Sequence, residues 1–191
     1  MNITYVLLAA FLWTKSYGNP EFTAQEQDPW NDIRAYLVEK NLADAESSLK
    51  LLQRTNEPPE VFIVQVDGKT SDQKLRRVVT MVRVAKRFRI RESTRLSGGT
   101  TYPDIIQAKA SILNRLNEEY SKHLKLYPST LKKTITADEV LLTDVHKIDE
   151  QNFEVVCETD HRALSGTVSI AKLIRNRDGS FYVTDLLTSK R

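Results

Sequence analysis

Apolar residues between positions 33 and 52 recur at steps of three to five, which is near the spacing of one face of an α-helix. These residues are Ile33, Leu37, Leu42, Ala45, Leu49 and Leu52. Asp28 is a residue type that caps helix N-termini, and Pro29 suits the first helical position. The pattern therefore predicts one long helix, which ends before the prolines at 58 and 59.

The next segment predicts strands. Val61–Val66 is rich in β-branched and aromatic residues, and Asp67–Gly68 is typical of the start of a turn. Residues 74–91 then hold eight cations and no acid. Strand alternation within this basic run places Val82, Val84, Phe88 and Ile90 on one face and Arg83, Arg87, Arg89 and Arg91 on the other, while Lys86 interrupts the apolar face.

A second helical pattern starts near Pro103 and stops at Pro128. Its apolar face consists of Ile105, Ala108, Ile112, Leu116, Tyr120 and Leu124. Four strand patterns follow, at residues 139–145, 152–159, 166–174 and 181–187. The short connections between them favour an antiparallel meander, and Asn176–Gly179 is a strong hairpin signal between the last two.

Each half of the chain thus predicts a long helix followed by antiparallel strands, and the expected fold class is α+β. The predicted organisation is a signal peptide (1–18), a flexible segment (19–29), a helix-plus-hairpin half (30–96), a linker (97–102) and a helix-plus-four-strand half (103–191). The two halves are either two small domains or one combined sheet.

The N-terminus indicates secretion. Residues 6–13 are apolar, no acid occurs before Glu21, and Ser16 and Gly18 are small residues placed for cleavage after Gly18. The apolar stretch is too short to cross a bilayer, which takes roughly 20 residues. A signal peptide and an extracellular destination are expected, and the alternatives are a buried helix or an uncleaved anchor.

Charge and cysteine content narrow the range of functions. The chain has 28 Lys plus Arg against 25 Asp plus Glu, so only a local cluster of cations could attract a polyanion. Cys157 is the single cysteine and cannot form an internal bridge. Alternation places it with Phe153 and Val155, so it is either a buried thiol or the site of an intermolecular disulfide.

No catalytic or metal-binding pattern is evident in the sequence. His123, His146 and His161 do not have zinc-site spacing, and the chain contains no nucleophile elbow, phosphate loop or dinucleotide fingerprint. Cys157 and His161 are conceivable as a nucleophile pair, but their spacing does not aim the imidazole at the sulfur. We therefore expect a non-enzymatic binding protein without a cofactor or a metal.

The basic run is the strongest candidate for a binding surface. Alternate residues of a strand lie about 6.6 Å apart, so the arginines would form a positive ladder that suits a sulfated glycan or an acidic extracellular protein. The candidate binding residues are Arg83, Lys86, Arg87, Arg89 and Arg91. Nucleic acid fits a secreted protein poorly.

Two alternatives for the basic run remain. Acids on neighbouring strands could neutralise the arginines. The run could instead form a cationic amphipathic helix, with Leu75, Val78, Val82 and Ala85 on one face, that lies on a membrane surface as part of an immune or membrane-active protein.

A short motif resembles a known family. Gln65-Val66-Asp67-Gly68 is similar to a shortened Gln-x-Val-x-Gly loop of the cystatin superfamily, and residues 153–158 resemble the strand that follows that loop. The resemblance implies that each half could be a long helix wrapped by an antiparallel meander. It also implies a cysteine-protease inhibitor with Gln65, Val66 and Gly68 in the protease cleft. An ordinary Asp-Gly turn is the alternative.

Overall fold

The computed structural model describes residues 27–44, 46–69, 74–85, 87–126, 134–161 and 166–190. The predicted signal peptide, the adjoining residues 19–26 and Lys86 lie outside the described residues. Residues 34–191 form one compact unit, and the described residues up to Ile33 lie outside it. Helix α1 (Gln27–Glu39) crosses this division.

Helix α1 is much shorter than the sequence pattern predicts. Asn41 adopts a positive φ of 56°, which asparagine tolerates better than most residues. Its N–H donates to the carbonyl of Val38 at 3.0 Å, and the N–H of Leu42 donates to the carbonyl of Leu37 at 2.9 Å. This pair of bonds is a Schellman motif, which ends the helix by satisfying its last carbonyls.

The leucines assigned to the end of that long helix belong instead to strand β1 (Ser48–Thr55). β1 pairs antiparallel with β2 (Glu60–Lys69), and the register shifts between Leu51 and Gln53. A bulge of this kind adds one unpaired residue, here Leu52, and breaks the two-residue period. The spacing of Leu49 and Leu52 therefore imitates a helix.

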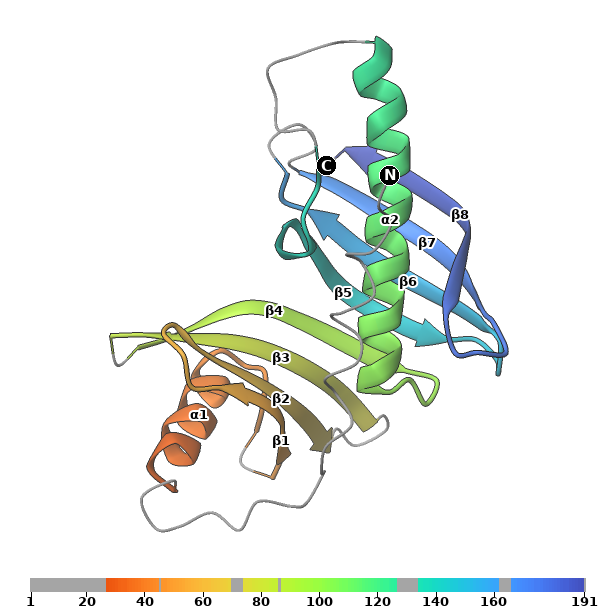
Figure 1. Ribbon diagram of the computed structural model, residues 1–191. Helices are drawn as coiled ribbons and strands as arrows, with labels where there is room; N and C mark the ends of the chain where they lie inside the picture. The colour runs from red at the N-terminus through yellow and green to blue at the C-terminus, as the bar shows by residue number, and fades with distance from the viewer. Residues whose placement is uncertain are drawn as a thin grey trace. The chain divides into compact units, whose positions relative to one another are not determined.

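The second half begins with helix α2 (Tyr102–Leu126) and a short 3₁₀ turn, η2 (Ala137–Glu139). The strands that follow are β5 (Val140–Lys147), β6 (Asn152–Thr159), β7 (Thr167–Arg175) and β8 (Phe181–Lys190). Figure 1 shows α2 lying across one face of β5–β8. These elements lie where the sequence predicts a helix and four strands.

All eight strands form one sheet in sequence order, with β3 (Lys74–Val84) and β4 (Arg87–Ser97) in its first half. Every neighbouring pair is antiparallel except β4 and β5, which run parallel. Strand accounts for 52% and helix for 25% of the residues that the structure describes. The α+β prediction of two long helices, each followed by strands, is therefore wrong: the fold is a mostly β mixed sheet with two helices.

The main core lies between α2 and β5–β8. Buried and partly exposed residues alternate without exception along β6, as expected for a strand with one face against a core. Phe153, Val155 and Cys157 are buried on that face, and Ile112 contributes to the same core from α2. Among the described residues, neither helix has the length and apolar character that crossing a membrane would require.

Candidate functional site

The basic run folds as a hairpin rather than as one strand. β3 ends at Val84, β4 begins at Arg87, and these two residues pair across the turn. Ala85 has a φ of 47°, the positive value that two-residue hairpin turns require. The single-strand prediction is therefore wrong, because the chain reverses inside the run. The amphipathic-helix alternative is also wrong, because the described residues of the run form strands apart from this turn.

The reversal places Arg83 on the opposite face from Arg87 and Arg89. Arg83 pairs with Phe88, and directly opposed residues point to the same face of a sheet. Its guanidinium lies 5.7 Å from the Phe88 ring centroid and 3.6 Å from a Glu60 carboxylate oxygen. Arg83 therefore has an acidic partner, which it shares with Arg54, and it does not belong to the predicted ladder.

Other arginines of β3 and β4 also have acidic partners. Arg76 lies 2.6 Å from Asp67, and Arg91 lies 2.6 Å from Asp138. Arg95 pairs with Asp144 across the parallel junction between β4 and β5. The alternative that nearby acids neutralise the basic run thus holds for Arg76 and Arg91.

Arg87 and Arg89 differ from this pattern. Both are exposed, and within the described part of the chain neither has an acidic group within ion-pair distance. They lie opposite Val84 and Val82 on one face of the hairpin, and Val84 is 48% exposed. We call this surface of Arg87, Arg89, Val82 and Val84 the arginine face. Lys86 lies outside the described residues.

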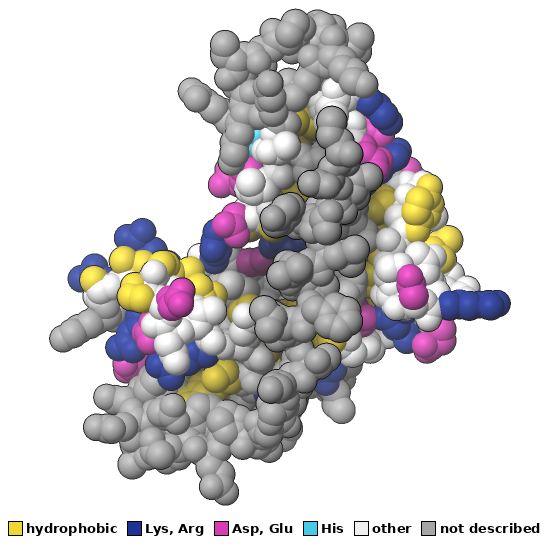
Figure 2. Space-filling view, viewed as in Figure 1, with side chains coloured by type: hydrophobic (Ala, Val, Ile, Leu, Met, Phe, Trp, Pro, Cys, Tyr) yellow, Lys and Arg dark blue, Asp and Glu magenta, His cyan; other side chains and the backbone are white. Residues whose placement is uncertain are grey.

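Figure 2 shows dark blue side chains gathered at the left of the view, over the end of the sheet where β3 turns into β4. Yellow side chains lie among them. The mixture agrees with the position of Val84, which is exposed and pairs with Arg87.

The predicted inhibitory residues lie inside a paired strand. Gln65, Val66 and Gly68 pair with Val78, Arg77 and Leu75 of β3, and β2 continues to Lys69. The prediction that a turn starts at Asp67–Gly68 is therefore wrong. Val66 is 2% exposed, so its side chain does not project as a wedge. Protease inhibition stays a prediction to which this geometry adds nothing.

Cys157 is a buried thiol. Its side chain is fully enclosed on β6, which leaves no accessible sulfur for an intermolecular disulfide. Burial raises the pKa of this thiol to about 11, and Lys109 opposes the shift. His161 is also buried, and its ring packs edge-on against Tyr120 at 5.0 Å. A protonated, enclosed thiol is a poor nucleophile.

The histidines whose side chains the structure describes do not form a metal site. The side chain of His123 lies outside the described part, and the Nδ1 of His146 lies 2.7 Å from the Ser97 hydroxyl. Among the described residues, no group of three or more His, Cys, Asp or Glu side chains could hold a metal ion.

A groove, which we call the α2 groove, opens between α2 and the face of β2–β4 that carries the arginine face. Its volume is about 390 Å³. Sequence reasoning did not find it, because its walls come from segments far apart in the chain. The lining residues are Ile63, Val78, Thr80, Arg91, Glu92, Thr94, Tyr102, Ile105, Ile106, Lys109, Ala110, Leu113, Ala137, Asp138 and Leu141.

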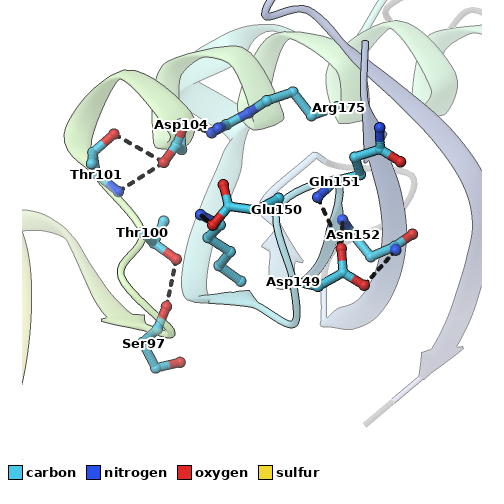
Figure 3. A network of polar contacts seen from close by, with 10 residues as sticks. Ser97, Thr100, Thr101, Asp104, Asp149, Glu150, Gln151, Asn152 and Arg175 are labelled. Carbon is cyan, nitrogen blue, oxygen red and sulfur yellow. Dashed lines mark hydrogen bonds and ion pairs between the residues drawn. The ribbon is translucent and has the colours of Figure 1, made fainter. Parts of the chain in front are cut away.

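A polar cluster fixes the start of α2 to the end of β7 (Figure 3). Asp104 accepts hydrogen bonds from the backbone N–H and the hydroxyl of Thr101, at 2.8 and 2.9 Å. The Arg175 guanidinium pairs with the same carboxylate and lies 4.8 Å from the Phe153 ring centroid. Because its members already bind one another, this cluster has a structural role.

An exposed apolar row lies on the face of β5–β8 away from α2. Ile170 opposes Leu187, and Ile174 opposes Tyr182. These four side chains are between 39% and 64% exposed.

Comparison with models of known protein families found no match, and no curated protein resembles the chain significantly.

Proposed function

We propose that this chain is a secreted, non-enzymatic protein that binds an anionic extracellular macromolecule through the arginine face. One observation carries the proposal: Arg87 and Arg89 are exposed without an acidic partner in the described structure, whereas Arg76, Arg83 and Arg91 each have one. In a chain with nearly balanced charges, such a pair creates a local positive potential.

The side-chain chemistry supports a sulfated or carboxylated partner. Guanidinium groups bind the oxygens of such anions in a two-point fork. Arg87 and Arg89 are alternate residues of β4, so their backbones lie about 6.6 Å apart and both side chains leave the same face. Two neighbouring anionic groups of one polymer could therefore be bound together. Sulfated glycans are the class that we would test.

The test is salt-dependent retention of the purified protein on heparin. Arg87→Glu with Arg89→Glu should elute at a clearly lower salt concentration than the wild type. We expect about a tenfold loss of affinity, equivalent to about 1.4 kcal/mol, because two attractive contacts become repulsive.

The matched control is Lys172→Glu with Arg177→Glu, which makes the same change in net charge at exposed positions of β7 and the turn after it. The control should elute near the wild type. Equal elution of both double variants would show that net charge alone governs retention, and the proposal would then be wrong.

A further inference from the structure

The α2 groove has the properties of a small-molecule site. Its volume of about 390 Å³ lies in the range of ligand pockets, which are mostly apolar with a few placed polar groups. Ile63 lines it from the sheet, while Ile106 and Leu113 line it from α2.

The charged residues of the groove are already satisfied. One Glu92 oxygen lies 2.8 Å from the Lys109 ammonium, and the other accepts the N–H of Leu142 at 2.8 Å. Arg91 pairs with Asp138 at 2.6 Å. Because these charges cancel locally, the groove suits an apolar group rather than an ion.

A bulge brings Arg91 and Glu92 to the same wall. Thr80 pairs with Glu92 and Met81 with Ile90, which leaves Arg91 as the extra residue of β4. Strict alternation would send two consecutive side chains to opposite faces, yet both line the groove. The bulge thereby places an ion pair at each of two points along the groove.

An apolar floor continues from the groove to Arg89. Ile63 pairs with Thr80, and Val61 pairs with Val82 one step closer to the hairpin turn, with both valines partly exposed. On its other side Val82 opposes Arg89. Directly opposed residues share a face, and Thr80 and Val82 are alternate residues of β3. The groove and the Arg89 guanidinium therefore lie on one face of the sheet.

We propose that the α2 groove binds the apolar chain of a free anionic amphiphile, such as a long-chain carboxylate, whose head group pairs with Arg89. The neutral groove accommodates the chain, and Arg89 supplies the complementary charge. This inference goes beyond the proposed function, because the groove has no part in holding a polyanion and only Arg89 is common to both.

The experiment is calorimetric titration of the purified protein with laurate, with dodecyltrimethylammonium as the cationic comparison. Laurate should bind at one molecule per chain, and the cationic amphiphile should bind at least tenfold more weakly. Arg89→Gln should weaken laurate about tenfold, because it removes a hydrogen bond between charged groups.

Ala110→Phe tests the groove itself. Ala110 lines the groove from an exposed position of α2, so a larger side chain should fill the space without disturbing the core, and laurate binding should be lost. Asn114→Phe is the matched control, because Asn114 is exposed on α2 outside the groove lining. It should bind laurate like the wild type. Thermal melting of both variants checks that they fold.

Three results would overturn the inference. They are no laurate binding at millimolar concentration, laurate binding that Ala110→Phe leaves unchanged, and binding only to anionic phospholipid vesicles or to an acidic peptide. If laurate fails while heparin retention still depends on Arg87 and Arg89, only this inference is lost. If laurate binds but the charge-reversed variant keeps its heparin retention, only the proposed function is lost.

Discussion

The strands β1–β4 and β5–β8 belong to one sheet but expose different chemistry. On the hairpin of β3 and β4, Arg87 and Arg89 are exposed without an acidic partner in the described structure. On β7 and β8, the exposed positions include Ile170 and Leu187. The sheet therefore has two kinds of exposed surface, and the candidate for binding anions lies on the hairpin of β3 and β4.

The two regions also differ in how they bury their apolar residues. β6 alternates strictly and contributes to the large core against α2. β1 has no fully buried residue, while Phe62, Val64 and Val66 of β2 are buried outside that core. Part of the buried set of β1–β4 is therefore its own, while Val78 of β3 and Leu96 of β4 belong to the core against α2. Whether the two regions unfold together can be tested.

The largest effect should come from deleting a buried ring in each region. Phe153 is 1% exposed and Phe62 is 2% exposed, so either change to alanine should lower the free energy of unfolding by about 3–5 kcal/mol. Because residues 34–191 form one unit, we expect a single urea transition in both variants. Tyr182→Ala, at a position 64% exposed, should lower the free energy of unfolding by no more than about 0.5 kcal/mol. A separate early transition in Phe62→Ala would mean that the two regions unfold independently.

A smaller effect is expected where the two regions join. Gly98 follows β4 at a φ of 66°, and a Cβ there would lie 1.9 Å from the Lys147 carbonyl oxygen at the end of β5. Gly98→Ala should therefore lower the unfolding free energy by about 2–4 kcal/mol, from overpacking and the left-handed backbone together.

Gly99→Ala is the matched control for this junction. Gly99 also has a positive φ, of 81°, but nothing lies within 4 Å of its added Cβ. Only the backbone cost of about 1–2 kcal/mol applies. Equal losses in the two variants, measured by urea unfolding, would contradict the close contact between the end of β4 and β5.

Cys157 makes the larger core sensitive to alkaline pH. Burial raises the pKa of its thiol from 9.0 to about 11, so the unfolded chain loses this proton first. The folded state then binds more protons, and stability falls as the pH rises from about 9 to 11. The loss attributable to this group is about 2–3 kcal/mol. It is measured by comparing how far the free energy of unfolding falls over this pH range in the wild type and in Cys157→Ala. An equal fall in both proteins would contradict the burial of the thiol.

The regular parts of the fold could be predicted and the irregular parts could not. Alternation along residues 152–159 defines β6, and helical spacing with prolines near both ends locates α2. The first helix was overextended because the bulge at Leu52 hides the alternation of β1. The turn at Ala85 was missed because alanine, unlike glycine or asparagine, does not indicate a turn residue with a positive φ.

The candidate site could be predicted only in part. The sequence indicated an unusual run of cations, and Arg87 and Arg89 were among the residues named. It could not indicate that Arg83 faces the other side, because that depends on where the hairpin turns. Nor could it indicate that Asp138, from η2, would pair with Arg91. Charge pairing across a sheet depends on the register of its strands, which cannot be derived from the amino-acid composition.

The central claim is that the unneutralised arginines of β4, and not its cations in general, bind anions. The most direct measurement compares heparin retention of Arg87→Gln with Arg89→Gln against Arg91→Gln with Arg95→Gln. Both variants remove two positive charges from one strand, but Arg91 and Arg95 pair with acids. We predict that the first variant elutes at a clearly lower salt concentration and the second close to the wild type. Equal losses, or a larger loss in the second, would contradict the claim.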